Sequence, residues 1–471
     1  MTVVIMKFGG SCLSDKNAFH KILKISEIYD NVGRVYVASA FNGVTNLLLQ
    51  MAQNVNNETE LDKNMAIVEK KHFDIIEEVF KEDSDEFYNI KGWVDNQLSE
   101  LEEIFVDIRE FGLEPYYQDS VLSYGEIIST YILNQFLINR GFDSIFIPAN
   151  KVIITNDEFN NAYPLYNLTN KRVEKMLIPF LENPKKNTII CITGFIGRNK
   201  IGYTTTLGRG GSDYTATILA HSIYEIGHDQ DIKVILWKDV DGLLAIAPNY
   251  VPKASLIRNL DYEEAKHIAN FGAKVLHPKC LEAIEKNHIP LEIRNFDKPL
   301  EKVNFTTISG FTDRNNIKGI SAVEDGLIIT ITSGSLVDVP GVLAKIFKIM
   351  SKNNISVSLV AQSASEISTS FIVKQQDAEK ALIALKKSEY FSDFFQIKSE
   401  EVAIINITGF KVLDNLTKVK IFQALEKKRI KVKALTQSID DLNFSLVINK
   451  SYLIDAINVI HRDLYEDFLD E

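Results

Sequence analysis

The feature that most constrains the fold is an internal repeat in the last third of the chain. The segment IFKIMSKNNISVSLVAQ, which begins at Ile346, recurs as IFQALEKKRIKVKALTQ, which begins at Ile421. The offset of 75 residues (421 minus 346) places Gln362 and Gln437 at equivalent positions. Each copy combines a helical pattern with strands rich in β-branched residues. Two tandem copies of one small α+β unit are therefore predicted.

The chain before the repeat alternates β-rich runs with helical runs, which predicts an α/β domain with a mainly parallel sheet. Residues 57–112 differ, because they are rich in Glu, Lys and Asp with apolar residues at helical spacing. They are predicted to form an amphipathic helical insert without a catalytic role. The domain boundaries that we predict are 1–305 for the α/β domain, 306–398 for a linker with the first repeat, and 399–471 for the second repeat.

Composition limits the partners and the compartment of this chain. The net charge is −11 and no block of Lys or Arg occurs, so a nucleic-acid partner is not expected. The three cysteines (Cys12, Cys191, Cys280) are far apart, which argues for a reducing compartment and against a disulfide framework. The N-terminus lacks the basic region of a signal peptide, and no apolar run is long enough to span a bilayer. These features predict a cytoplasmic protein without a membrane partner.

A glycine-rich stretch, TTTLGRGGSDYTA at 204–216, precedes a predicted helix. Its three glycines allow the backbone N–H groups to form an anion-binding nest, and Ser212 or Asp213 can cap the helix. A capped helix after a glycine turn would explain everything here except Arg209. An arginine at the tip of such a loop offers a rigid fork for a carboxylate or a phosphate. The glycines are Gly208, Gly210 and Gly211.

Three further stretches place a glycine beside a charged residue: SYGE at 123–126, WKDVDG at 237–242 and FGAKVLHPK at 271–279. The first predicted strand also ends in MKFGGS, in which Lys7 can reach a phosphate and two glycines permit close approach. This is not a Walker A motif, and taken alone it reads as an ordinary strand–turn–helix corner. The co-occurrence of all these stretches in one chain favours a phosphate site.

In combination these motifs resemble the aspartokinase family over nearly the whole chain, and the repeat resembles a pair of ACT domains. The resemblance implies an α/β fold, a three-layer αβα sandwich with a mainly parallel sheet, followed by two α+β ferredoxin-like ACT domains. It implies phosphorylation of the β-carboxylate of L-aspartate by ATP with Mg²⁺, the first step toward lysine, threonine and methionine. No homoserine dehydrogenase domain follows, so a monofunctional enzyme is expected.

This chemistry agrees with the residues present. The nucleophile is the substrate's own carboxylate, whose unperturbed pKa of about 3.9 leaves it ionised at neutral pH without a general base. Catalysis of phosphoryl transfer then consists of positioning and charge neutralisation.

The resemblance also implies the roles of individual residues. The catalytic set is Lys7 at the transferring phosphoryl group, Lys274 on its opposite side, and Asp213, which orders the cationic groups. Substrate aspartate would meet Arg209 through a carboxylate and Glu126 through its ammonium group, with hydroxyls from Ser39 and Thr45. Mg²⁺ is expected to be bound mainly through the phosphates of ATP, without direct protein ligands. ATP and its phosphates would contact Gly9, Gly10, Ser11, Gly208, Gly210, Gly211, Ser212, Lys238, Asp239 and Lys274.

Several positions depart from the family pattern. Lys238 replaces a usual threonine, and Asn249 after Ala247 replaces an arginine that can contact the nucleotide. Cys12 stands where a serine is common. Ser358 replaces an aspartate that lysine-inhibited relatives often carry, whereas QSASE at 362–366 resembles threonine-responsive relatives.

The feedback effector is therefore expected to be threonine or lysine, bound at a loop of the first ACT domain. For the two glutamines, a role as ordinary surface residues is the alternative. ACT domains commonly pair across subunits, so a homodimer is expected. The candidate effector residues are Asp338, Val339, Gly341, Ser356, Gln362 and Gln437.

Two other functions remain open from the sequence. One is a different amino-acid kinase, acting on glutamate or acetylglutamate, against which the LGRGGSDYTA and FGAKVLHPK motifs argue. The other is an amino-acid sensor that has lost phosphotransfer, which the departures at Ala247 and Asn249 would allow. The retained charged residues Lys7, Arg209 and Asp213 argue against it.

Overall fold

A computed structural model describes most of the chain, and it divides into two compact units. The first comprises residues 1–243, 256–265 and 274–312, and the second comprises 244–255, 266–273 and 313–471. We describe each unit by itself. The described residues are 2–82, 84–182, 188–227, 231–252, 254–271, 275–298, 304–310, 317–332, 341–365, 367–391, 395–437 and 442–465.

The first unit is built on an eight-stranded sheet with the strand order β3-β5-β2-β1-β8-β10-β11-β9. The six strands from β3 to β10 are parallel, as predicted, and β11 runs antiparallel to β10. The central strands β1 and β2 are buried along their whole length because both faces of a parallel sheet are covered, and Lys7 and Arg34 are their only charged residues. The strands are β1 (Val3–Phe8), β2 (Gly33–Ala38), β3 (Ser144–Ile147), β5 (Ile189–Thr193), β8 (Ile232–Lys238), β9 (Asn259–Leu260), β10 (Leu291–Asn295) and β11 (Thr306–Ile308).

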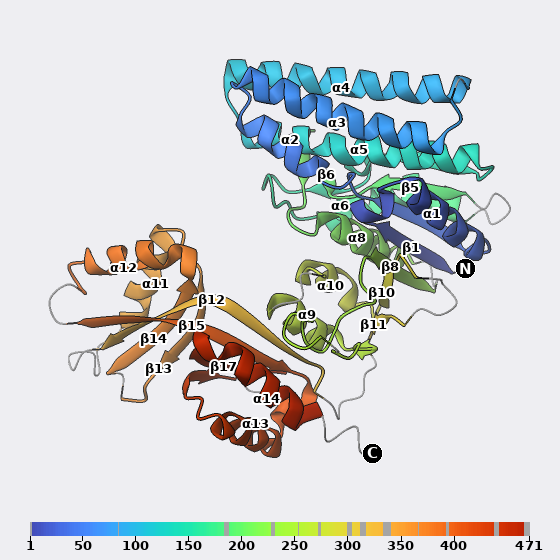
Figure 1. The fold of residues 1–471 in the computed structure, drawn as a ribbon. Coiled ribbons are helices and arrows are strands. Elements are labelled where there is room, and N and C mark those ends of the chain that lie inside the picture. Colours follow the sequence, from blue (N-terminus) through green and yellow to red (C-terminus); the bar gives the residue numbers. More distant parts are fainter. Residues whose placement is uncertain are drawn as a thin grey trace. The chain divides into compact units, whose positions relative to one another are not determined.

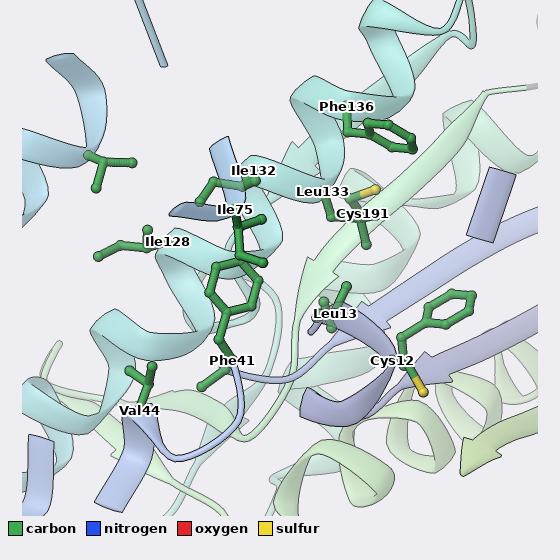
Figure 2. Packing of buried hydrophobic residues seen from close by; sticks show 14 of the residues in the cluster. Cys12, Leu13, Phe41, Val44, Ile75, Ile128, Ile132, Leu133, Phe136 and Cys191 are labelled. Carbon is green, nitrogen blue, oxygen red and sulfur yellow. The ribbon is translucent and has the colours of Figure 1, made fainter. Parts of the chain in front are cut away.

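Helices cover both faces of this sheet (Figure 1). Val4, Met6 and Phe8 of β1 join a core with the helices α1 to α5, and Figure 2 shows Leu133 and Phe136 of α5 beside Cys191 of β5. α8 packs against β1 and β8. The helices are α1 (Lys16–Ile28), α2 (Val44–Gln53), α3 (Glu58–Val79), α4 (Asp85–Phe111), α5 (Pro115–Asn139), α6 (Tyr166–Met176), α7 (Ile178–Leu181), α8 (Gly211–Glu225), α9 (Tyr262–Phe271) and α10 (Pro278–Glu285).

The predicted helical insert is α3 with α4, which lie beside α2 and α5 (Figure 1). Their buried residues recur at helical spacing and their other faces are exposed, as the sequence pattern indicated. None of the described helices is long and apolar enough to cross a membrane.

A second, small sheet was not predicted from the sequence. It consists of β4 (Ile154–Thr155), β6 (Ile196–Asn199) and β7 (Thr204–Thr206). Its strands have two to four residues, too short for a period-2 pattern to be recognised. This sheet carries the chain directly into the glycine-rich loop.

The second unit has one six-stranded antiparallel sheet with the order β13-β14-β12-β15-β17-β16. The repeat is confirmed, because β14 and β17 begin 75 residues apart (443 minus 368). Its helices are α11 (Val342–Lys352), α12 (Ala378–Lys386), α13 (Asn415–Lys427) and α14 (Leu453–Tyr465). Its strands are β12 (Gly319–Thr332), β13 (Val357–Gln362), β14 (Ser368–Lys374), β15 (Gln396–Thr408), β16 (Val432–Thr436) and β17 (Asn443–Asn449).

The long strands β12 and β15 each serve both repeats. The C-terminal half of β12 joins the core of the first repeat through Ile329 and Ile331. Its N-terminal half joins the core of the second repeat through Ile320, beside Ile405 and Ile407 of β15. The predicted boundary at 398/399 thus falls inside β15, and the one at 305/306 lies just before β11, which pairs with β10. Both boundaries stay predictions.

Candidate active site

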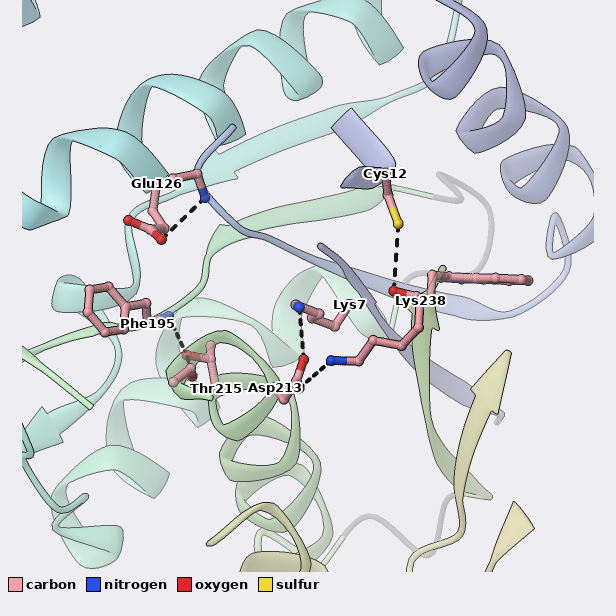
Figure 3. Close-up of polar contacts among 10 residues, drawn as sticks. Lys7, Cys12, Glu126, Phe195, Asp213, Thr215 and Lys238 are labelled. Atoms are coloured by element: carbon pink, nitrogen blue, oxygen red, sulfur yellow. Dashed lines mark hydrogen bonds and ion pairs between the residues drawn. The ribbon is translucent and has the colours of Figure 1, made fainter. Parts of the chain in front are cut away.

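The centre of the candidate site is a buried ion-pair cluster at the C-terminal ends of β1 and β8. Lys7 Nζ lies 2.9 Å from Asp213 Oδ1, and Lys238 Nζ lies 2.6 Å from Asp213 Oδ2 (Figure 3). β1 and β8 are neighbours in the sheet, and Asp213 comes from the first turn of α8. The structure therefore brings three predicted site residues together from three separate elements.

The charges in this cluster stabilise one another. Burial alone would raise the pKa of Asp213, but Lys7 and Lys238 together lower this pKa to about 2. Burial would likewise lower the pKa of Lys7, but its pairing with Asp213 raises this pKa. Two lysines share one carboxylate, so the cluster carries one net positive charge.

The glycine-rich loop has the backbone that its sequence requires. Gly208 and Gly210 have φ of 78° and 73°, which is the left-handed region that glycine adopts readily. Gly210 caps α8, and a side chain on Gly211 would meet the Phe195 ring at 2.6 Å. The predicted Ser212 is half-buried in the first turn of this helix. The first N–H groups of α8 lie in the same helical turn as Asp213. The N-terminus of a helix favours the binding of an anion.

Arg209 is exposed at the tip of this loop. It has no ion pair or hydrogen bond to another residue in the part of the chain that the structure describes. A guanidinium in this position presents all of its donors to solvent and to an incoming anion.

Gly9 and Gly10 form the corner after β1. A side chain on Gly10 would lie 2.8 Å from the carbonyl oxygen of Ala40, so only glycine allows this close approach of two backbones. Ser11 is exposed, and Ser39 and Thr45 are half-buried around the turn between β2 and α2. Ser39 lies beside the glycine corner, since its N–H donates a hydrogen bond of 3.1 Å to the carbonyl oxygen of Phe8, and Thr45 lies in the first turn of α2.

Glu126 is a buried carboxylate on α5 with spare hydrogen-bonding capacity. Its Oε1 accepts a hydrogen bond of 3.2 Å from Ala40 N (Figure 3), and its buried Oε2 has no hydrogen-bond partner among the residues that the structure describes. Burial raises the pKa of Glu126 to about 8, although the Ala40 bond and the nearby Lys7 oppose this. A cationic group that bound at Oε2 would donate a hydrogen bond to this oxygen and would favour the ionised form of Glu126.

Asp239, which was predicted to contact the nucleotide, is exposed just after β8, and Asp241 accepts a hydrogen bond of 2.7 Å from Asn295. Cys12 is buried with its thiol 3.6 Å from the carbonyl oxygen of Trp237. Burial raises the pKa of this thiol to about 11, so Cys12 is an inert packing residue. Among the described residues, no three His, Cys, Asp or Glu side chains converge as metal ligands would.

The predicted residues Lys274, Asp338 and Val339 lie outside the described residues. Of the other effector candidates, Gly341 begins α11 with a φ of 84°. Ser356 and Gln362 are exposed, at the start and the end of the strand region of β13. Gln437 is half-buried and its amide lies 3.5 Å from the carbonyl oxygen of Val412.

The buried acid Asp119, on α5, was not predicted from the sequence. It accepts hydrogen bonds from the backbone at Asn160 and Thr206. The only signal in the sequence was a charged residue seven positions before Glu126 on a largely apolar helix. Lys279, whose Nζ lies 2.5 Å from Asn161 Oδ1 beside the glycine-rich loop, was not predicted either.

Two parts of the chain match the models of known protein families. Residues 2–295 match the model of the amino acid kinase family, and residues 329–388 with 417–464 match an ACT domain. The class of the protein follows from the first match, which covers more than half of the sequence: the chain belongs to the amino acid kinase family.

The relatives identify the branch of the family as the aspartokinases. The lysine-sensitive aspartokinase 3 of Escherichia coli is 30% identical over 362 residues, which are 77% of this chain and 76% of that protein. A bifunctional aspartokinase/homoserine dehydrogenase of Buchnera aphidicola is 28% identical over 98% of this chain, which spans only 56% of that protein's length. The crystal structure of E. coli aspartokinase III in complex with aspartate and ADP superposes with a TM-score of 0.78 at 25% identity, over 98% of this chain and 100% of that one. The predicted family and fold class are thus confirmed.

Proposed function

We propose that this chain catalyses the transfer of the γ-phosphoryl group of ATP to the β-carboxylate of L-aspartate, forming 4-phospho-L-aspartate. The observation that carries the proposal is the buried cluster of Lys7, Asp213 and Lys238 beside the N-terminus of α8. The relatives of this chain include proteins named aspartokinases, and one of them binds aspartate and ADP.

In this proposal the cluster neutralises charge on the transferring phosphoryl group. Lys7 stands at the strand end where the sheet opens, and Asp213 holds it in place. The net positive charge of the cluster and the N–H groups of α8 both favour a phosphate at this point. Lys274 would approach from the opposite side, as the family resemblance implies.

Aspartate would bind between Arg209 and Glu126. The exposed guanidinium would hold a substrate carboxylate, and the unpartnered Glu126 Oε2 would accept the substrate ammonium group. Ser39 and Thr45 would donate hydroxyl hydrogen bonds at the same end. No general base is needed, because the attacking carboxylate is already ionised.

The phosphates of the nucleotide would contact Gly9, Gly10 and the glycine-rich loop. Further contacts with ATP would come from Ser11, Ser212, Lys238 and Asp239. Mg²⁺ would bind together with ATP and not directly to Asp213. Both oxygens of this central carboxylate are already paired with lysines. Bound through the phosphates, the ion would neutralise charge on the triphosphate. A cytoplasmic location agrees with the three buried free cysteines.

We further propose feedback control through the repeated module, with threonine or lysine as the effector. Gly341, the N-cap of α11, supports this placement, together with Gln362 and Gln437 at equivalent positions of the two repeats. A homodimer through this module is expected. Exposed apolar residues on α13, namely Leu416, Val419 and Phe422, support an additional interface there.

Trapping of the acyl phosphate with hydroxylamine tests the activity directly. The purified chain with ATP and Mg²⁺ is expected to form a hydroxamate from aspartate but not from glutamate or acetylglutamate. Lys7→Ala is the matched inactive control, and added threonine or lysine identifies the effector by inhibition. A signal with glutamate alone would indicate a different amino-acid kinase, and no signal from folded protein would indicate a sensor.

A further inference from the structure

Asp119 is a fully buried carboxylate on α5, with no cation among the hydrogen-bond partners that hold it. Its Oδ2 accepts hydrogen bonds of 2.8 Å from Thr206 N and 2.9 Å from Asn160 N. Its Oδ1 accepts one of 2.7 Å from Thr206 Oγ1 and lies 3.2 Å from Asn160 N. Three neutral donors from two other segments therefore converge on one side chain.

These donors lie on either side of the glycine-rich loop. Thr206 ends β7, two residues before Gly208. Asn160 and Asn161 form the wall that Gly208 faces, since a side chain on Gly208 would lie 2.7 Å from Asn161 Oδ1 and 3.1 Å from the carbonyl oxygen of Asn160. One carboxylate thus holds both the start of the loop and the wall beside it.

Asp119 and Glu126 are seven residues apart on α5, so they lie on the same helix face. The rise between them is about 10 Å along the helix axis. Asp119 determines where the Arg209 loop begins, and Glu126 is the group proposed to bind the substrate ammonium. A single rigid helix thereby relates the two proposed ends of the aspartate site.

We propose that Asp119 is a positioning residue for aspartate: it fixes the Arg209 loop relative to Glu126, so that one substrate molecule can meet both groups. The inference rests on the proposed function for its choice of substrate. It assigns Asp119 no contact with aspartate or ATP.

The chemistry of the side chain supports this role over simple packing. Burial raises the pKa of Asp119 to about 6, which the three hydrogen bonds oppose. A carboxylate can accept at both oxygens, whereas the amide of an asparagine would turn an N–H group toward donors. The acid accepts from the two backbone N–H groups at Oδ2 and from the Thr206 hydroxyl at Oδ1 at the same time.

The first test is the kinetics of Asp119→Asn. We expect the KM for aspartate to rise roughly ten- to a hundredfold, because buried donors lose a charged acceptor, while the KM for ATP changes less than about twofold. Thr206→Val removes one donor and should give a smaller rise in the same parameter. The matched control is Asp143→Asn, which removes a carboxylate that accepts a hydrogen bond from Thr188 and lies outside the loop's contacts.

A double-mutant cycle separates positioning from general damage to the fold. If Asp119 acts through Arg209, then Asp119→Asn should add little to the KM for aspartate in an Arg209→Ala background. Fully additive effects, or an equal rise in both KM values, would overturn the proposal.

Hydrogen exchange in the ligand-free protein tests the same inference without any substrate. Residues 204–211 should exchange faster in Asp119→Asn than in wild type, and Asp143→Asn should leave them unchanged. Unchanged exchange in Asp119→Asn would refute the positioning role. Failure of wild type to phosphorylate aspartate would instead refute the proposed function, so the two failures are distinguishable.

Discussion

Lys238 pairs with the carboxylate of Asp213 at 2.6 Å, on the oxygen that Lys7 does not use. In the sequence, Lys238 was a departure from a usual threonine. In the structure it is the second cation of the central cluster. The departure therefore adds a positive charge where phosphate is expected.

Lys238→Thr should weaken ATP binding more than aspartate binding. The change removes the net positive charge of the cluster, and we expect a roughly tenfold rise in the KM for ATP. Steady-state kinetics with each substrate varied will measure it. Lys233→Thr is the matched control, because Lys233 lies on the same strand and pairs with Glu292 at 3.5 Å, away from Asp213. A larger effect on the KM for aspartate would contradict this assignment.

Asp213→Asn should abolish activity and destabilise the fold by about 3 kcal/mol, because two lysines lose their shared partner in a buried place. Urea denaturation measures the loss. The pKa of Asp213 is lowered to about 2 from 3.8, so the stabilisation is complete above the unfolded value and is lost as pH falls through about 2. The difference in unfolding free energy between wild type and variant should therefore shrink between pH 4 and pH 2. A constant difference over this range would mean that the charge of Asp213 is not what stabilises the fold.

Arg209→Ala should raise the KM for aspartate roughly ten- to a hundredfold and leave that for ATP nearly unchanged, because the exposed guanidinium is proposed to hold a substrate carboxylate. Because Arg209 makes no ion pair or hydrogen bond to another described residue, thermal stability should not fall. Arg209→Lys keeps the charge but not the planar fork, so it should recover only part of the affinity. Equal effects on both substrates would rule out the proposed contact.

Glu126 predicts a pH dependence of aspartate binding. Its pKa is raised to about 8 by burial, so the ligand-free site is largely protonated at pH 6.5, and binding the substrate ammonium requires ionisation. The KM for aspartate should fall roughly tenfold between pH 6.5 and pH 8.5. Glu126→Gln should bind aspartate weakly at every pH and lose this dependence. A profile identical to that of wild type would exclude Glu126 as the ammonium ligand.

The raised pKa of Glu126 also makes the free energy of unfolding depend on pH. The folded state holds a proton on Glu126 that the unfolded state releases near pH 4.5, so this group disfavours folding increasingly as pH rises from there to about 8. If the stability of the wild type falls as pH rises through this range, the stability of Glu126→Gln should fall less. Thermal melts across the range provide the measurement.

Much of the fold follows from local sequence patterns. The alternation of β-rich runs with helical runs predicted a mainly parallel sheet, and its central strands β1 and β2 are buried along their whole length. The 75-residue offset predicted the second unit, and β14 and β17 keep that offset in the structure. The glycines before α8 predicted a backbone that only glycine adopts readily, and Gly208 and Gly210 have it.

Tertiary structure alone decided which charges meet. Nothing local to Lys7 indicates that its partner is Asp213, 206 residues later (213 minus 7), or that Lys238 shares that partner. Asp119 was overlooked for the same reason, because its donors come from β7 and from the loop at Asn160. Backbone hydrogen bonding is periodic and leaves a pattern in the sequence. The pairing of buried side chains depends on how distant elements pack, and it leaves no such pattern.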